Sequence, residues 1–334
     1  MYLCHIKFFK MIELNFPLPT KDDIVAAARR VEPYIRRTPV LTCDNINKRY
    51  DTELFFKCEN LQQAGSFKSR GACNNLLQLT SEERQRGVCT HSSGNHAAAL
   101  ARAAGLFGTK AFIVMPQNSE KTKIEMVKNY DGEIFFCDPT LEAREAVLQQ
   151  VQRQTDAIEI HPYNNLRTIT GQATACKELI EQCTEKLDVI MAPVGGGGLL
   201  SGTALSAHYF GDNVRVIAGE PENADDATQS FYAGKLIPVG KTETIADGLR
   251  TSLGSYTFPI ISNYVYDIYP VSEEAIVEAL RLIFDKMKIV VEPSSAVPLA
   301  VIMENISKFI GKKIGIILSG GNIDVQRMAR VLQR

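Results

Sequence analysis

Apolar strand-like runs and helical patterns alternate along most of this chain. The runs that we predict to be strands span residues 54–58, 88–90, 111–115, 133–137, 157–160, 188–192, 214–219 and 313–318. Helical patterns fill the gaps at residues 95–104, 120–129, 141–154, 168–182, 199–209 and 273–287. Because parallel strands need long crossovers that helices usually supply, this alternation predicts an α/β fold with parallel sheets covered by helices.

The length of the chain predicts two domains. A chain of 334 residues is too long for one small core and suits two. No repeat, low-complexity tract or Gly/Ser linker marks a boundary between them. Ligands of such folds bind at the carboxyl ends of the strands, so we expect a site in a crevice that two sheets share.

The start of the chain predicts a tail followed by a helix. Residues 1–16 are mildly apolar, but lysines interrupt them, and they are too short for a signal sequence or a membrane span. We expect a poorly ordered or loosely docked tail. Thr20 and Asp23 then form a capping-box pattern, and Pro33 should end or kink the helix that follows.

The composition excludes several classes of partner. Lys and Arg together number 37, Asp and Glu 38, and the net charge is −1, so neither nucleic acid nor a membrane surface is expected as a partner. The eight cysteines are scattered and never spaced as Cys-x-x-Cys. This pattern predicts reduced thiols in a cytoplasmic protein, without a disulfide frame or a zinc site.

Four segments are candidates for one site, and the first contains Lys68. The stretch Ser66–Gly71 places this lysine after a strand-like run and at the start of a helical pattern. The positive end of a helix dipole favours the neutral amine, which can attack an aldehyde to form an imine. Taken alone, the stretch fits an ordinary solvated lysine better.

The second segment, His91–His96, lies between a short strand and a helix. Successive backbone N–H groups at a helix start, with Ser and Asn donors, suit a carboxylate. A capped helix start, with Ser93 or Asn95 as the N-cap, is the alternative, and the sequence leaves both open.

The third segment is the glycine run of residues 194–198. Four glycines between a strand and a helix favour a phosphate site over a plain turn. A dinucleotide fingerprint does not fit, because its third glycine would fall on Leu200 or Ser201. The fourth segment, Leu318–Asn322, is either an ordinary turn or a loop that presents Ser319 to the crevice.

In this order, the four segments resemble the pyridoxal-phosphate (PLP) enzymes of the tryptophan-synthase-β fold, called fold type II. The resemblance is greatest to the serine racemase and serine/threonine dehydratase group and runs from Thr38 to Asn322. It implies a small mobile domain, residues 86–164, inserted in a large PLP-binding domain formed by residues 1–85 and 165–334. It also implies a homodimer.

The resemblance assigns the cofactor residues. Lys68 would hold PLP covalently and take the substrate Cα proton, and Phe67 would pack on the pyridine ring. Asn95 would contact the ring hydroxyl, and Ser319 would bond the ring nitrogen. The phosphate would lie on Gly195, Gly196, Gly197, Gly198 and Leu199. A neutral hydroxyl at the ring nitrogen makes a weaker electron sink than an aspartate would, which favours loss of a β-substituent.

The resemblance also assigns the substrate residues. The substrate carboxylate would bind Ser92, Ser93, Asn95 and His96, with Arg144 nearby; a solvated helix arginine is the alternative for Arg144. Ser93 would be the second proton-transfer group, on the face opposite Lys68. Threonine-specific dehydratases usually carry Ala there, whereas racemases carry Ser. A chain with both Lys68 and Ser93 is expected to racemise and to eliminate.

The stretch from Glu220 to Asp226 resembles the divalent-cation site of the family. Glu220 and Asp226 would be carboxylate ligands, with the carbonyl of Ala224 between them, and oxygen ligands suit Mg²⁺, Ca²⁺ or Mn²⁺. A capped helix with acids in its first turn is the alternative. Gln63 and Ala64 replace the Lys-Thr pair that animal racemases present to a nucleotide, so we expect no activation by ATP.

The function that the resemblance implies is a PLP-dependent serine racemase with L-serine and L-threonine dehydratase activity. The products would be D-serine, and pyruvate or 2-oxobutyrate with ammonia. A threo-3-hydroxyaspartate dehydratase, or another β-elimination or β-replacement enzyme of the cysteine-synthase kind, is the alternative. A catalytically inactive amino-acid sensor is a remote one, and the intact Lys68 argues against it.

Overall fold

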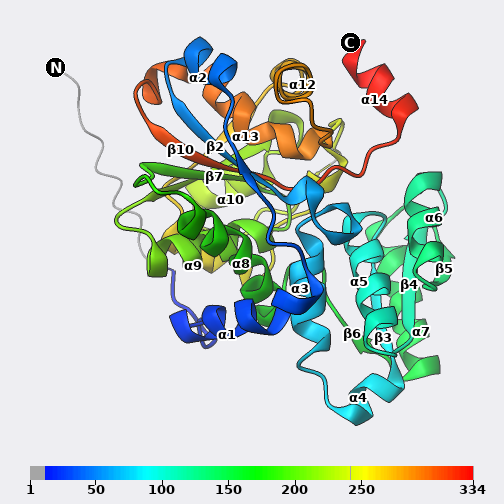
Figure 1. Ribbon diagram of the computed structural model, residues 1–334. Helices are drawn as coiled ribbons and strands as arrows, with labels where there is room; N and C mark the ends of the chain where they lie inside the picture. The colour runs from blue at the N-terminus through cyan, green and yellow to red at the C-terminus, as the bar shows by residue number, and fades with distance from the viewer. Residues whose placement is uncertain (1–11, 241, 334) are drawn as a thin grey trace.

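The computed structural model describes residues 12–240 and 242–333, which form two lobes, each built on one sheet (Figure 1). The larger sheet has six strands in the order β1-β2-β10-β7-β8-β9. All its neighbouring strands are parallel except the β1–β2 pair. Its strands are β1 (Val40–Leu41), β2 (Glu53–Cys58), β7 (Val189–Pro193), β8 (Arg215–Pro221), β9 (Asp267–Val271) and β10 (Lys313–Leu318). We call this sheet and its helices the large lobe.

The smaller sheet has four parallel strands in the order β5-β4-β3-β6. Its strands are β3 (Val88–His91), β4 (Ala111–Pro116), β5 (Glu133–Cys137) and β6 (Ile158–Glu159). The helices packed with it are α5 (Asn95–Leu106), α6 (Lys121–Asn129) and α7 (Leu141–Thr155). We call this unit the small lobe. All its elements come from one continuous stretch of the chain.

The other helices lie before and after that stretch. They are α1 (Lys21–Val31), α2 (Asp44–Tyr50), α3 (Lys68–Leu76), α4 (Ser81–Arg86), α8 (Leu166–Gln182), α9 (Gly198–Phe210), α10 (Asp226–Ala233), α11 (Thr257–Tyr264), α12 (Glu273–Leu282), α13 (Pro293–Glu304) and α14 (Val325–Leu332). Helix α3 packs against both α8 and α5. It therefore joins the two lobes, and Lys68 is its first residue.

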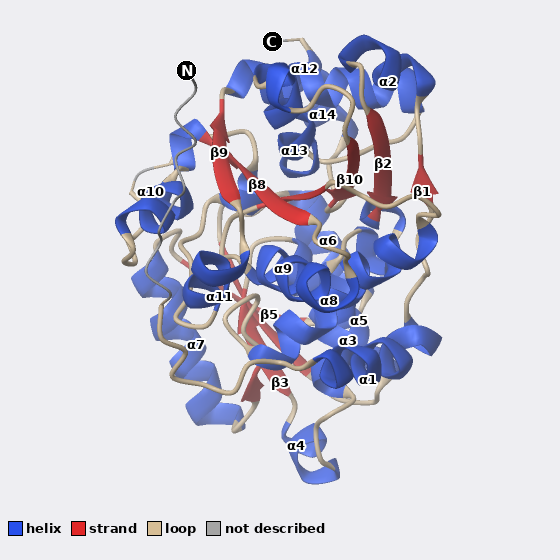
Figure 2. Ribbon diagram, turned by 90° about the vertical axis from the view of Figure 1, so that its left-hand side faces the viewer, coloured by secondary structure: helices blue, strands red, loops and turns tan. Residues whose placement is uncertain are grey.

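Alternating residues of the central strands build two cores in the large lobe. Val189 and Met191 of β7 belong to the core shared with α12 and α13. Ile190 and Ala192 of the same strand point the other way, into the core under α8 and α9. Because strand side chains alternate between faces, both faces of the sheet are covered by helices, as Figure 2 shows.

The predicted α/β fold with parallel, helix-covered sheets is confirmed, and every predicted strand overlaps an observed one. The sequence analysis missed the strands β1 and β9 and the helices α2, α4, α11 and α13. Strand β9 lies at the sheet edge and contains Pro270, which breaks the strand pattern. Helix α13 is apolar on all sides and carries Pro298 in its interior, so no amphipathic period identifies it.

The capping box is confirmed at α1, where the Asp23 N–H donates to the Thr20 hydroxyl at 3.2 Å and the Thr20 N–H donates to Asp23 at 2.8 Å. The helix ends at Val31, before Pro33. Of the tail predicted over residues 1–16, residues 1–11 lie outside the described residues. The rest is docked: the backbone of Ile12 exchanges two hydrogen bonds of 2.8 Å with the Asn263 side chain.

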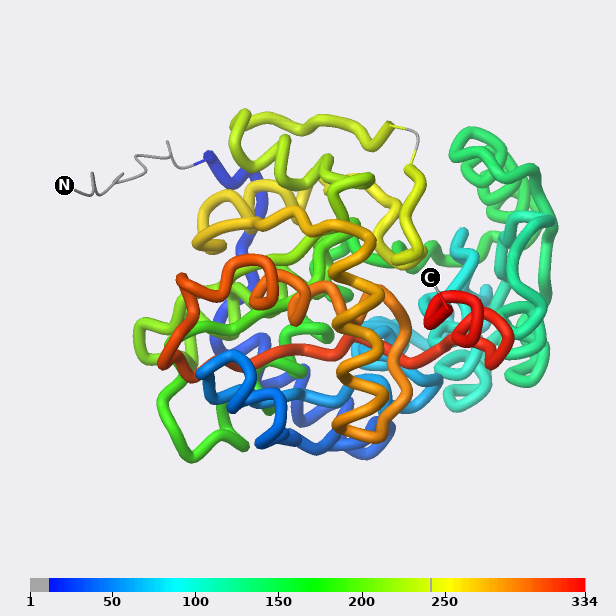
Figure 3. The backbone as a smooth tube through the Cα atoms, turned by 90° about the horizontal axis from the view of Figure 1, so that it is seen from above, coloured from blue at the N-terminus to red at the C-terminus, as the bar shows by residue number. Residues whose placement is uncertain are grey.

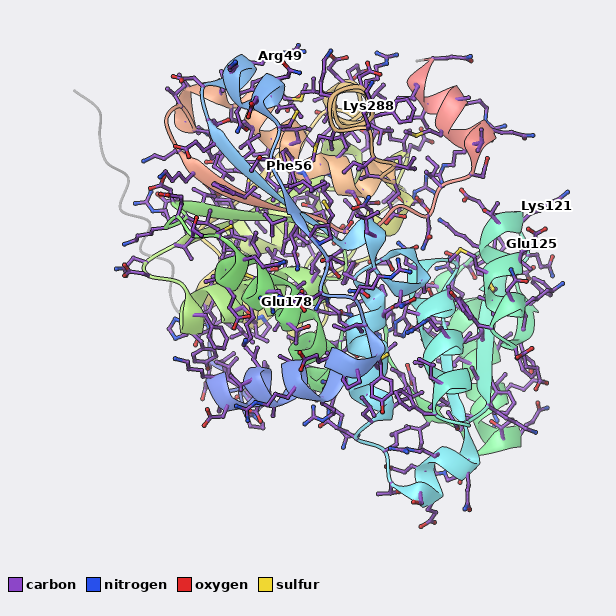
Figure 4. All side chains as sticks on the ribbon, viewed as in Figure 1. Arg49, Phe56, Lys121, Glu125, Glu178 and Lys288 are labelled. Atoms are coloured by element: carbon purple, nitrogen blue, oxygen red, sulfur yellow. The ribbon has the colours of Figure 1, made fainter. Side chains whose placement is uncertain are left out.

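A buried ion cluster anchors α3 to its neighbours. The Arg70 guanidinium donates to both oxygens of Glu59, at 2.7 and 2.8 Å, and to both oxygens of Glu178, also at 2.7 and 2.8 Å. The Lys57 amine donates to Glu178 at 2.6 Å and to the Thr38 carbonyl at 2.8 Å. Glu178, labelled in Figure 4, is a buried residue of α8. The cluster fixes α3 two residues after Lys68.

The described cysteines, seven in number, are all free, and six of them are buried. In the portion of the chain that the structure describes, no helix has both the length and the apolar character needed to cross a membrane.

Candidate active site

The four segments meet at one cavity of about 160 Å³. All the residues predicted to bind cofactor or substrate border it: Phe67, Lys68, Ser92, Ser93, Asn95, His96, Arg144, Gly195, Gly196, Gly197, Gly198, Leu199 and Ser319. The structure therefore brings these residues together, while the role of each residue stays a prediction.

Hydrogen bonds from Asn322 hold three of the segments in place. Its side-chain amide donates to the Ala64 carbonyl and to the Asn95 side-chain oxygen, both at 2.8 Å. Nearby, the Phe67 N–H donates to the Ser319 carbonyl at 3.0 Å. The last loop is therefore not an independent turn, because it joins the Lys68 segment to the start of α5.

Lys68 is the first residue of α3, and its amine occupies a confined position beside the cavity. The amine donates to the Pro162 carbonyl at 2.7 Å and lies 5.1 Å from the centre of the Phe67 ring. Burial lowers the pKa of Lys68 to about 8, although the nearby Glu292 carboxylate opposes this shift. A far larger fraction of this amine than of an exposed lysine is therefore neutral near pH 7.

The glycine run opens onto the cavity at the start of α9. Gly197 occupies the N-cap position with φ of 86°, and no side chain among the described residues caps this helix. A Cβ at Gly196 would lie 2.4 Å from the Tyr163 ring, so no larger residue fits there. The free N–H groups of the first turn suit a phosphate. Together with Lys68, these residues fit PLP.

Ser319 keeps a proton that it can redirect. Its hydroxyl oxygen lies 3.1 Å from that of Ser295, whose own proton goes to the Gly320 carbonyl at 2.6 Å. Because Ser295 has a single proton, Ser319 must be the donor in that pair. A rotation of the Ser319 hydroxyl would offer this proton to an acceptor in the cavity.

The loop between β3 and α5 is open to an anion. Gly94, and neither Ser93 nor Asn95, occupies the N-cap position of α5, and within the described chain no side chain caps this helix. The alternative of a side-chain-capped start is therefore wrong. The Ser92 hydroxyl instead accepts the Gly94 N–H at 3.3 Å, and the N–H groups of the first turn stay available.

His96 and Arg144 differ in how they face the cavity. His96 is almost fully buried, and its Nε2 lies 2.8 Å from the Ile160 carbonyl. Burial lowers the pKa of His96 to about 3, so its ring is neutral. Arg144 is half-buried, and its Nε is shielded from solvent without a partner among the described residues. Arg144 is therefore the side chain better suited to a carboxylate.

The sequence analysis missed several residues that line the cavity, namely Lys123, Pro162, Tyr163, Asp247 and Glu292. The Glu292 carboxylate accepts a bond of 2.7 Å from the Asn95 amide, and burial raises its pKa. None of these residues belongs to a glycine-rich or Ser-rich motif. A titratable residue beside a proline at a helix start, as in Glu292-Pro293, is too common to signal a site.

The predicted cation site is only partly open. The Glu220 carboxylate already accepts the Ala227 N–H at 3.0 Å and both the N–H and the hydroxyl of Thr228, at 2.8 and 2.7 Å. The Glu220 carboxylate therefore caps the first turn of α10, in line with the alternative that this stretch is a capped helix start. Both carboxylate oxygens of Asp226, however, are buried without a partner among the described residues. Asp226 and Ala224 line a surface hollow.

Another cluster near the cavity does not suit a metal. One ligand atom from each of His91, Glu159 and His161 lies within 4.8 Å of the others. However, Nδ1 of His161 accepts the Asn164 N–H at 2.9 Å. The proton of the neutral His161 ring is therefore on Nε2, and the lone pair on Nδ1 is already used. No nitrogen of this ring is left to bind a metal, as a histidine ligand must do while its other nitrogen donates an N–H.

Comparison with known proteins identifies the family. A family model described as pyridoxal-phosphate dependent enzyme matches residues 31–320. The chain belongs to this family. A serine racemase of Dictyostelium discoideum is 46% identical over 94% of this chain and 98% of its own. A beta-hydroxyaspartate dehydratase of Paracoccus denitrificans is 46% identical over 93% of this chain and 98% of its own.

The solved structures confirm the predicted fold. The structure of maize serine racemase matches with a TM-score of 0.91 at 44% identity, and the match covers 95% of this chain and 98% of that one. The predicted fold type II and the membership in a PLP-dependent enzyme family are thus both confirmed.

The environment of Lys68 predicts the pH dependence of cofactor loading. Only the neutral amine attacks the PLP aldehyde, so the rate of covalent loading of the apoenzyme should rise with pH and level off above about 8. An unperturbed lysine would keep gaining rate up to a pH of about 10.4. Stopped-flow absorbance with PLP measures the rate, and Lys68→Ala is the control. A rate still climbing at pH 10 would contradict the assignment.

Proposed function

We propose that this enzyme acts on small β-hydroxy amino acids, racemising serine and eliminating water from serine and threonine. The products would be D-serine, and pyruvate or 2-oxobutyrate with ammonia. The observation that supports this most directly is that Lys68 and Ser93 border the same cavity. Lys68 comes from the large lobe and Ser93 from the small one.

PLP, when bound, supplies an electron sink for the charge that develops at the substrate Cα. Racemisation also needs two proton-transfer groups, one on each face of that carbon. Lys68 Nζ would take the proton from L-serine, and Ser93 Oγ would deliver one on the opposite face. Elimination needs only Lys68 and the departure of the β-hydroxyl, so it does not require Ser93.

The remaining residues would hold the reactants. The backbone of residues 195–199 would bind the phosphate, Ser319 the ring nitrogen and Asn95 the ring hydroxyl, with Phe67 against the ring. The open N–H groups after Ser92 support a carboxylate site at the start of α5. The side-chain amide of Asn95 keeps one proton for a ligand, because it donates the other to Glu292.

Replacing Ser93 separates the two reactions. Ser93→Ala should lose D-serine formation by roughly two orders of magnitude or more, the size of a general acid or base contribution, and still release pyruvate from L-serine. Chiral chromatography and a keto-acid assay measure the two products. Ser81→Ala, at an exposed serine of α4 that does not border the cavity, is the control and should keep racemisation. Racemisation that survives Ser93→Ala would refute the role of this residue.

A second substrate, L-threo-3-hydroxyaspartate, is favoured by Arg144. The Nε of this side chain has no partner within the described residues, and the side chain lines the cavity. A second carboxylate on the substrate would supply the partner in bidentate form. Relatives whose names specify hydroxyaspartate, at 46% and 40% identity, point the same way.

Arg144→Met should lower kcat/KM for L-threo-3-hydroxyaspartate more than it lowers kcat/KM for L-serine. The difference should be about tenfold or more, because a charge-assisted bond contributes about 1.5–3 kcal/mol. Arg153→Met, on the exposed side of the same helix, is the control and should change neither value. An equal loss on both substrates would assign Arg144 to the α-carboxylate instead. Oxaloacetate and pyruvate assays distinguish these outcomes.

We further propose that Glu220, Ala224 and Asp226 hold a divalent cation such as Mg²⁺. Burial raises the pKa of Glu220 to about 8 and that of Asp226 to about 7. Both values lie above those of the unfolded chain. Without a cation, stability should therefore fall as the pH rises from about 4 to 8 and these groups ionise. A cation would offset the charge on the two buried carboxylates, and the orphaned oxygens of Asp226 suit it.

Mg²⁺ should raise the melting temperature more at pH 8 than at pH 6, because the carboxylates are ionised at the higher pH. Thermal unfolding with Mg²⁺ or a chelator measures the effect. Asp226→Asn should remove it, and the exposed neighbour change Glu222→Gln should not. A melting temperature that does not respond to Mg²⁺ at pH 8 would exclude the site.

The predicted organisation completes the proposal. Residues 86–164 would be the small mobile domain, inserted between the two parts of the large one (1–85 and 165–334), and all four strands of the small lobe fall within that span. The enzyme would be a cytoplasmic homodimer, and the free cysteines support a reducing compartment. Light scattering tests the dimer, and turnover of L-serine would exclude the inactive-sensor alternative.

A further inference from the structure

Helix α14 lies between α12 and the small lobe, as the view in Figure 3 shows. Its carboxyl end is fixed to the large lobe, because the Arg281 guanidinium donates two bonds to the Leu332 carbonyl, at 3.1 and 2.6 Å. Met328 and Val331 pack into the core of the same lobe. The helix is therefore a rigid part of the large lobe.

The amino end of α14 reaches across to the small lobe through Arg327. The guanidinium forms an ion pair with Glu120, which directly precedes α6. It also donates to Asp247 at 3.2 Å and to the Ile245 carbonyl at 2.9 Å, both in the large lobe. The Arg327 side chain is only 15% exposed, so water screens these contacts much less than it screens a surface pair.

The side chain of Lys123 extends this contact to the loop that carries Ser93. Lys123 of α6 is buried, pairs with Asp247 and lies 3.7 Å from Glu120. Its Nζ is also 3.7 Å from the position that a Cβ on Gly94 would occupy. Lys123 thus lies beside the loop that carries Ser93, with space for about one methyl group between its amine and Gly94. Ion pairs connect Arg327 through Asp247 to Lys123, whose amine ends next to this loop.

The four side chains form a square of alternating charge. Arg327 and Lys123 each lie next to both Glu120 and Asp247, and each acid comes from a different lobe. Removing Arg327 would leave two carboxylates to share the single charge of Lys123. The ion pair of Lys123 with Asp247 would then compete with its pairing to Glu120. The loop beside Lys123 would no longer be held at a fixed distance from the large lobe.

We propose that Arg327 is a positioning residue, which sets the place of the Ser93 loop relative to Lys68 by tying α14 to Glu120 and Asp247. It does not border the cavity. This inference rests on the proposed function, because it concerns the proton transfer assigned to Ser93. Racemisation needs the small-lobe loop and the large-lobe lysine in register, whereas elimination depends on Lys68. Loss of Arg327 should therefore impair racemisation more than elimination.

The test compares product ratios in PLP-loaded variants. Arg327→Gln should lower the ratio of D-serine to pyruvate from L-serine by roughly tenfold, since small misplacements of reacting groups have effects up to about a hundredfold. Arg327→Lys should restore part of the ratio. Glu120→Gln should lower it, and the double variant should show less than the product of the two single effects. Two solvent-facing controls, Arg330→Gln in α14 and Lys121→Gln in α6 (Figure 4), should leave it unchanged.

A second measurement does not depend on turnover. Amide hydrogen exchange of the holoenzyme should speed up in the segment from β3 to the start of α5 when Arg327 is changed to Gln, and should not do so in the two controls. Faster exchange without any racemisation by the wild type would leave the positioning role intact and remove the proposed function. An unchanged product ratio, an equal loss of both products, or exchange no faster than in the controls would overturn the inference. If Arg327→Gln does not fold, Arg327→Lys and Glu120→Gln decide in its place.

Discussion

The position of Lys68 depends on the buried pairing of Arg70 with Glu59 and Glu178. Each partner belongs to a different element, because Glu59 follows β2, Arg70 lies in α3 and Glu178 in α8. Removing one member of such a cluster leaves an uncompensated buried charge, which destabilises a protein by about 3–5 kcal/mol. An apolar cluster could supply similar stability, but the planar guanidinium also fixes direction. The ion cluster therefore holds the start of α3 against two neighbours, and Lys68 is the residue that this helix presents to the cavity.

The parts of the site that could be predicted from the sequence are those whose function shows in local composition. Four consecutive glycines, or a lysine after a strand and before a helix, restrict the backbone and its chemistry without any knowledge of distant contacts. The residues that escaped prediction act through the tertiary structure. Lys123, Asp247, Glu292 and Arg327 are scattered over two hundred positions, and each looks like an ordinary surface charge in its own segment. Only the folded chain brings the first three to the cavity and pairs Arg327 with Asp247 beside it.

The contrast between local composition and tertiary contacts also explains which helices and strands were predicted correctly and which were missed. Buried parallel strands such as β4 and β7 are continuous apolar runs between turns, so their sequences identify them. Edge strands and fully buried helices lack that signal, as β9 and α13 show. The alternative of a capped start at Ser93 or Asn95 was wrong for a related reason. Residue type predicts a preference for capping, but the backbone at Gly94 places that glycine at the cap and leaves the amides of α5 for a ligand.

The order of strands in the large sheet has a consequence for biosynthesis. Strand β10 pairs with β2 on one side and β7 on the other, yet it is the last strand to leave the ribosome. During translation β2 has no partner in the centre of the sheet, and the apolar faces of β2 and β7 wait for some 120 residues after β7 is made. Contacts between such distant segments slow folding and leave sheet edges unpaired. A nascent chain therefore exposes these apolar faces, to which chaperones bind, until β10 has been made.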